Sequence, residues 1–143
     1  MDDRGRRLLW HGMALFVLGL LTGLAQGAFK NPRMGLAAHL EGIMNGTFLL
    51  ALGGVWSKVQ LSARLQSAAY WTALCGTYGN WLVTTLAAIF GTAAMTPIAS
   101  AGYRGERWQE LAATFGFVAV GIAILAAAIL LLLGFRRQRP ERR

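Results

Sequence analysis

Charged residues and cysteine are scarce in this chain. Of its 143 residues 14% are charged, six of them acidic, whereas 55% are hydrophobic and the mean hydropathy is positive. This balance excludes an ordinary soluble domain. The single cysteine, Cys75, excludes an intrachain disulfide and a cysteine-based zinc cluster. Phosphate-binding loops, dinucleotide fingerprints and a Ser-His-Asp set are also missing, so the common signatures of soluble enzymes do not apply.

The few charges leave four long apolar windows, over residues 8–29, 34–57, 65–103 and 111–135, with Glu41 as their one charged residue. About 20 apolar residues in a helix cross the ~30 Å hydrocarbon layer of a membrane. We therefore predict an all-α membrane protein, a single domain over residues 1–143 built as a bundle of four transmembrane helices. Their expected bounds are about 8–28, 35–56, 68–96 and 109–135.

Basic residues predict how these helices are oriented, because cytoplasmic loops carry the excess of lysine and arginine. Ten basic residues fall on the side of the two termini and four on the other, which places both termini in the cytoplasm. The same residues account for the pI of about 11.1 as topology signals and contacts to anionic lipid. We therefore expect no nucleic-acid partner. The ten are Arg4, Arg6, Arg7, Lys58, Arg64, Arg136, Arg137, Arg139, Arg142 and Arg143.

The segment 35–56 carries three polar residues at membrane depth, where such groups are rare and usually functional. At 100° per residue, His39 shares a stripe with glycines, whereas Glu41 and Asn45 lie on a second stripe. The glycines would clear space for a flat, bulky ligand, or equally for close packing of another helix. The first stripe is Gly35, His39, Gly42, Gly46, Leu49 and Gly53, and the second is Ala38, Glu41, Asn45, Phe48 and Leu52.

Two residues of the third predicted helix, Asn80 and Thr84, fall at a similar depth and share a face at the i, i+4 spacing. We expect them to line one cavity in the outer half of the bilayer together with His39, Glu41 and Asn45. Glu41 is then neutral, paired or proton-handling; alternatively it pairs with Arg33 or Arg104 near the surface. His39 is either a ligand or a histidine hydrogen-bonded to a neighbouring helix. His11, at the other end of the membrane, is read as structural or interfacial.

Three phrases, HGMALFVLGLLTGL, KNPRMGLAAHLEGIMNG and YGNW, together resemble the hydroxylaminobenzene mutases, small bacterial membrane enzymes. More distantly the chain is similar to styrene oxide isomerases, four-helical trimers that use haem b as a Lewis acid. The resemblance implies a homo-oligomer, a trimer, in the bacterial inner membrane, with His39 as the axial ligand of the haem iron and Asn45 in the substrate pocket. A functional tyrosine of the isomerases aligns with Thr84, and Glu41 has no carboxylate counterpart there.

By this resemblance the reaction converts aryl hydroxylamines to 2-aminophenols, with ferric haem b polarising the N–O bond. Glu41 is the expected base and Asn45, Asn80 and Thr84 complete the catalytic wall, while Gly42 and Gly46 clear the face beside His39 for haem. The haem would lie between protomers. Three alternatives remain open: an epoxide isomerase on the same scaffold, a small multidrug/proton antiporter that uses Glu41, and a haem-binding or structural subunit without catalysis.

Overall fold

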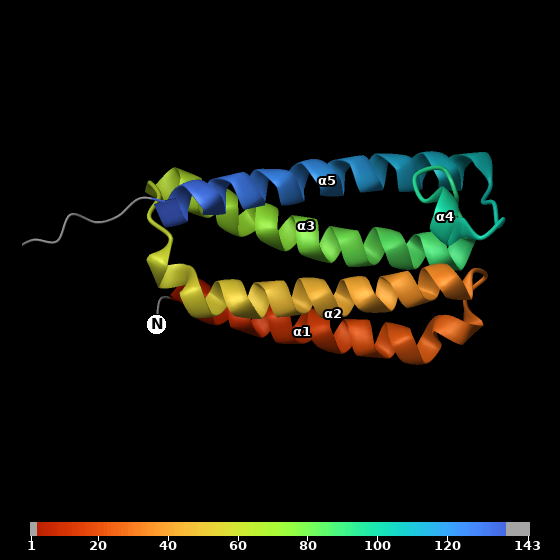
Figure 1. Ribbon diagram of the computed structural model, residues 1–143, viewed down its shortest axis with the longest axis horizontal. Helices are drawn as coiled ribbons and strands as arrows, with labels where there is room; N and C mark the ends of the chain where they lie inside the picture. The colour runs from red at the N-terminus through yellow and green to blue at the C-terminus, as the bar shows by residue number, and fades with distance from the viewer. Residues whose placement is uncertain (1–2, 137–143) are drawn as a thin grey trace, which may run out of the picture.

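The computed structural model describes residues 3–136, all of whose regular elements are helical. The tail arginines from Arg137 onward, which contribute to the predicted orientation, lie outside the described residues. Four helices are long and three elements are short, and Figure 1 shows their arrangement. The elements are α1 (Asp3–Ala25), η1 (Gln26–Ala28), α2 (Pro32–Val55), η2 (Trp56–Lys58), α3 (Ala63–Phe90), α4 (Pro97–Ser100) and α5 (Arg107–Arg136).

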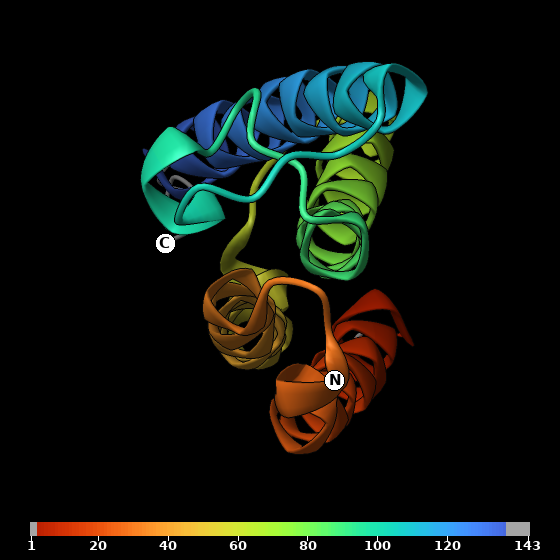
Figure 2. The same ribbon diagram turned by 90° about the vertical axis from the view of Figure 1, so that its right-hand side faces the viewer.

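The long helices form two antiparallel pairs. Helix α1 packs along α2, and α3 packs along α5, while α2 joins the pairs by packing on α3 (Figure 2). Among the described residues, α2 and α5 are not a pair in extensive contact. The start of α1 and the end of α5 lie at the same end of the bundle (Figure 1). Two buried clusters fill the ends of the bundle, one around Trp56 and Tyr70 and one around Met34 and Ala88.

Helix ends differ from the predicted ones for local reasons. Helix α3 ends at Phe90, well before residue 96, because Gly91 takes a left-handed conformation (φ +68°) and its N–H bonds the carbonyl of Ala87. Helices α1 and α3 begin earlier than the apolar windows, at Asp3 and Ala63, since polar residues can extend a helix beyond the hydrophobic stretch. Amino-acid composition therefore predicts where the apolar part of each helix lies but not the residues at which the helix begins and ends.

Lys30 and Asn31 tie the two loops at one end of the bundle together. The Asn31 side chain, fully buried, caps α2 by accepting from the N–H of Met34 (3.1 Å) and donates to the carbonyls of Ala99 and Ser100 (both 3.0 Å). Lys30 Nζ donates to the carbonyls of Phe90 and Arg104 (both 3.0 Å). The turn between α1 and α2 thus binds the C-terminal end of α3 and holds the α3–α5 connection against the start of α2.

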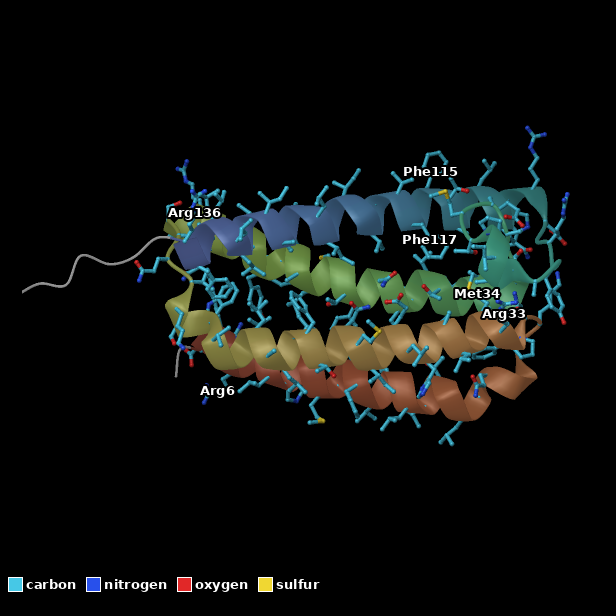
Figure 3. The ribbon with its side chains drawn as sticks, in the orientation of Figure 1. Arg6, Arg33, Met34, Phe115, Phe117 and Arg136 are labelled. Atoms are coloured by element: carbon cyan, nitrogen blue, oxygen red, sulfur yellow. The ribbon has the colours of Figure 1, made fainter. Side chains whose placement is uncertain are left out.

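Among residues 3–136, three helical segments are long and apolar enough to cross a membrane: Asp3–Ala28, Ala63–Phe90 and Arg107–Arg136. Helix α2 is of similar length, but its polar residues lower its hydropathy. Figure 3 shows Arg6 and Arg136 at one end of the bundle and Arg33 at the other, with the long helical surfaces between them largely apolar. The chain is therefore an all-helical membrane protein.

Candidate active site

A carboxylate held by two amides lies at the contact of α2 and α3. Asn45 Nδ2 donates to Glu41 Oε2 at 3.1 Å, one helical turn along α2, and Asn80 Nδ2 donates to the same oxygen from α3. Within the described residues Glu41 forms no ion pair, so the alternative of a partner in Arg33 or Arg104 is wrong. Both donors use one oxygen, which leaves Oε1 without a protein partner in the described part of the chain.

Glu41 and Asn45 line a pocket of about 280 Å³ between α2, α3 and α5. This volume is near the lower end of the range for small-molecule sites. Thr77 contributes no free donor to it, because its hydroxyl bonds the carbonyls of Ala73 and Leu74. A small ring could thus lie in an apolar cleft with its reacting end at the carboxylate. The lining residues are Glu41, Met44, Asn45, Phe48, Ala73, Thr77, Ile124, Ala127 and Ala128.

His39 lies on the opposite side of α2, against α1. Its Nδ1 is 2.8 Å from the carbonyl oxygen of Gly19, and its ring is seated on Gly23, where an added Cβ would come within 2.4 Å of Nδ1. A carbonyl can only accept, so Nδ1 carries the proton and Nε2 keeps its lone pair. Nε2 has no partner among the described residues. This donor set fits a single axial ligand to a metal, with the ring oriented by a backbone carbonyl.

The glycine stripe of α2 is filled by α1. A Cβ on Gly42 would lie 2.4 Å from Gly19 Cα, and one on Gly46 would lie 2.6 Å from the backbone nitrogen of Phe16. The cofactor-binding role predicted for Gly42 and Gly46 therefore does not agree with the structure, since no flat ligand fits between these glycines and α1. Their small size instead permits close packing of the two helices.

Of the five residues expected around one cavity, the structure brings three together. Glu41, Asn45 and Asn80 come together. Thr84 is buried and donates to the carbonyl of Asn80, its own helix, so its hydroxyl does not face the pocket. His39 and Glu41 are two residues apart, which at 100° per residue turns them about 160° from each other around α2. One protomer therefore presents two separate polar sites.

His11 belongs to neither site. The hydroxyl of Tyr78 donates to the His11 carbonyl (3.1 Å) and lies 3.3 Å from His11 Nδ1. His11 and Gly19, the partner of His39, are eight residues apart on α1, about 12 Å along the helix. A cofactor held by both histidines of one chain is therefore excluded. In residues 3–136 no group of three or more His, Cys, Asp or Glu side chains could hold a metal ion.

Sequence reasoning missed the contribution of α5, because it assigned no site residue to the fourth predicted helix. Ile124, Ala127 and Ala128 form the wall of the pocket that faces Glu41. No polar residue marks this wall. The available signal was the run Ala126–Ala127–Ala128 within an otherwise bulky segment, since small residues leave space beside a helix.

Comparison with known proteins identifies relatives along almost the whole chain. A model of the styrene oxide isomerase family matches residues 4–136. Hydroxylaminobenzene mutase HabB of Ectopseudomonas oleovorans is 45% identical over 139 residues, which cover 96% of this chain and 84% of the relative. Hydroxylaminobenzene mutase HabA of the same organism is 42% identical over 127 residues, covering 88% and 94%. No solved structure matches the chain.

These matches confirm the resemblance drawn from the three sequence phrases and make the chain an enzyme of the isomerase class. The arrangement of the pocket residues comes from the structure rather than from these matches. The chain belongs to the styrene oxide isomerase family.

Proposed function

We propose that the protein is an integral membrane mutase that converts aryl hydroxylamines of the hydroxylaminobenzene type to 2-aminophenols. The observation that carries the proposal is the Glu41 carboxylate, which two amides hold at the wall of a small, largely apolar pocket. Relatives named for this reaction, at 45% and 42% identity, support it. The chain would span the inner membrane of a bacterium four times, with both ends in the cytoplasm.

The reaction moves oxygen within one molecule and needs no oxidant. The N–O bond breaks, a C–O bond forms at the ortho carbon, and the ortho hydrogen leaves as a proton. Glu41 Oε1, which has no protein partner in the described chain, would take that proton while Oε2 stays bound to Asn45 and Asn80. The same carboxylic acid can return the proton to nitrogen. A pocket of apolar side chains keeps water from attacking the electron-poor ring.

His39 would hold the iron of a haem b. Its Nδ1 is committed to the Gly19 carbonyl and its Nε2 lone pair is free, which suits an iron ligand. When bound, ferric haem would supply the Lewis acid that polarises the N–O bond. His39 and Glu41 of one chain point to nearly opposite sides of α2, so we propose a homo-oligomer, a trimer, in which His39 of one protomer serves the pocket of another.

Two substitutions test these assignments separately. Glu41→Gln can still accept from both asparagines but cannot take a proton, so turnover of phenylhydroxylamine should fall about 10²–10⁴-fold while the haem absorption spectrum is unchanged. His39→Ala should lose both the haem spectrum and activity. Wild-type turnover in Glu41→Gln would refute the role of Glu41 as base, and full haem content with activity in His39→Ala would refute the iron ligand.

Mixing the two inactive variants tests the shared site. In a mixed oligomer the Glu41→Gln chain keeps His39 and the His39→Ala chain keeps Glu41. If a site is shared between neighbouring chains, some sites of the mixed oligomer therefore contain both intact residues. Activity should therefore reappear after the variants are co-expressed. A mixture as inactive as either variant alone would place both groups in the same protomer.

An epoxide isomerase is the second candidate, because the matching family model is that of styrene oxide isomerase. The rearrangement of an epoxide to an aldehyde needs a polarised C–O bond, as the hydroxylamine reaction needs a polarised N–O bond, and both need a pocket that excludes water. Comparing turnover of styrene oxide with that of phenylhydroxylamine decides between them. An antiporter, by contrast, would show no haem spectrum and no product from either compound.

A further inference from the structure

The wall that faces Glu41 across the pocket is made by α5, and its geometry differs from residue to residue. Ile124 is fixed, because it fills the space above Gly76 of α3, where an added Cβ would meet Ile124 Cγ1 at 2.7 Å. Ala127 is 2% exposed and belongs to the buried core. Ala128 is exposed and lies at the rim. The wall is therefore rigid at its back and open at its edge.

The size of the pocket depends on these three side chains. Helices α2 and α5 make no extensive contact, and two of the three α5 residues that line the pocket are alanines, whereas the nearby Leu125, Ile129 and Leu130 are bulky. A leucine in place of either alanine would extend into the space opposite Glu41. The pocket measures about 280 Å³, near the lower end of the ~300–1,000 Å³ usual for ligand sites, so one added side chain takes up a sizeable part of it.

From this geometry we infer that α5 sets how well the pocket accepts rings of different size: Ile124 and Ala127 form the fixed back wall and Ala128 the rim, so a smaller back wall favours a larger ring and a bulkier rim disfavours any ring. The inference rests on the proposed function, since it takes the Glu41 pocket as the substrate site. It assigns a specificity role to a helix whose side chains carry no reactive group. No bond is made or broken by α5.

The test compares kcat/KM for phenylhydroxylamine and naphthylhydroxylamine in the same preparation, so that partial misfolding cancels in the ratio. Ile124→Val removes one methyl group from the back wall, and one methylene-sized change in an apolar pocket shifts discrimination about 10-fold or more. The naphthyl/phenyl ratio should therefore rise about 10-fold in Ile124→Val. Ala128→Leu should raise KM for phenylhydroxylamine about 10-fold and lower kcat much less.

Ala119→Leu is the matched control. Ala119 is also exposed on α5, is absent from the pocket lining, and lies nine residues from Ala128, which places it on the opposite face of the helix. The same change in side chain should leave both kinetic constants at wild-type values. If Ile124→Val and Ala128→Leu keep the wild-type ratio and KM, as the control does, the inference is overturned.

Binding of unreactive amines separates this inference from the proposed reaction. Aniline and naphthylamine carry the rings without the N–OH bond, and their affinities can be measured by titration calorimetry of the detergent-solubilised full chain. Aniline binding that Ala128→Leu weakens and Ala119→Leu does not would support the size limit even if no hydroxylamine were converted, in which case the mutase proposal alone would fail. Aniline binding that Ala128→Leu and Ala119→Leu leave equally strong, or weaken equally, would overturn the size limit.

Discussion

Helix α1 packs so closely on α2 at Gly42 that adding a single methyl group there should destabilise the fold. An alanine Cβ there would lie 2.4 Å from Gly19 Cα, 2.9 Å from the Gly19 nitrogen and 3.0 Å from Trp81 Cδ1. Carbon atoms pack at about 3.5–4.0 Å, and two of the three atoms are backbone, which cannot rotate away. The helices must therefore separate by about 1 Å in this region, with a cost of about 1–3 kcal/mol for overpacking.

Gly54→Ala is the control for this prediction. Nothing lies within 4 Å of a Cβ at Gly54, and the position is exposed on the same helix. Alanine should stabilise the helix there by up to about 1 kcal/mol relative to glycine. Because Gly42→Ala gains the same propensity, the free energies of unfolding of the two variants should differ by the overpacking cost, about 1–3 kcal/mol. Unfolding by sodium dodecyl sulfate in mixed micelles, followed by far-ultraviolet circular dichroism, measures both.

The comparison should be made on protein purified without haem, because packing within one chain does not depend on a cofactor. Gly42→Ala should then unfold at a lower detergent fraction than wild type, and Gly54→Ala at the same fraction or a higher one. If Gly42→Ala were as stable as Gly54→Ala but bound less haem, the glycines would serve a flat cofactor and the packing argument would be wrong.

Three further substitutions test the connections around the bundle by the same unfolding assay. Asn31→Ala removes the cap of α2 and two buried donors, and should cost about 1–3 kcal/mol; Asn31→Ser, which keeps a capping oxygen, should cost less. Gly91→Ala places a Cβ at φ +68°, 3.1 Å from Lys30 Cδ, and should cost about 1–2 kcal/mol, with Gly91→Asn milder; equal losses would contradict the left-handed strain. Tyr78→Phe loses the contacts of the hydroxyl with the carbonyl and Nδ1 of His11 and should cost about 0.6 kcal/mol per bond without altering turnover; a large loss of kcat would place His11 and Tyr78 in the reaction.

Much of the fold follows from where charges are missing. Four windows with Glu41 as their one charge predict four long helices, and the structure has them in α1, α2, α3 and α5. The ends could not be predicted as well, because they depend on single backbone conformations such as that of Gly91 and on the distant carbonyls that Lys30 and Asn31 reach. Hydropathy carries no information about such contacts.

The site was predictable in part for the same reason. The i, i+4 spacing of Glu41 and Asn45 predicts one face, and helix depth brings Asn80 to the same level; the structure joins all three. Thr84 differs because a threonine hydroxyl in a helix can bond the carbonyl four residues earlier, which removes it from a pocket.

The contact of His39 with α1 was not predicted, although the glycines of α1 indicate it. Gly12 meets Gly46, Gly19 meets Gly42, and Gly23 meets His39, which is the register of two antiparallel helices joined by a short turn. A wheel of α2 alone shows the stripe but not the neighbour that covers it. Comparing glycine positions on consecutive helices would have predicted the contact.

The packing of α1 on α2 also limits how the chemistry can be arranged. A polarising group and a proton acceptor must both lie within a few ångströms of one ring to act on it together. The side chains of His39 and Glu41 leave α2 about 160° apart. On the glycine face of α2, which lies between them, α1 packs directly on the helix. No rotamer change brings the two to one ring within a protomer. If both take part in the rearrangement, a second chain must complete each site, and activity should then depend on the oligomer remaining assembled.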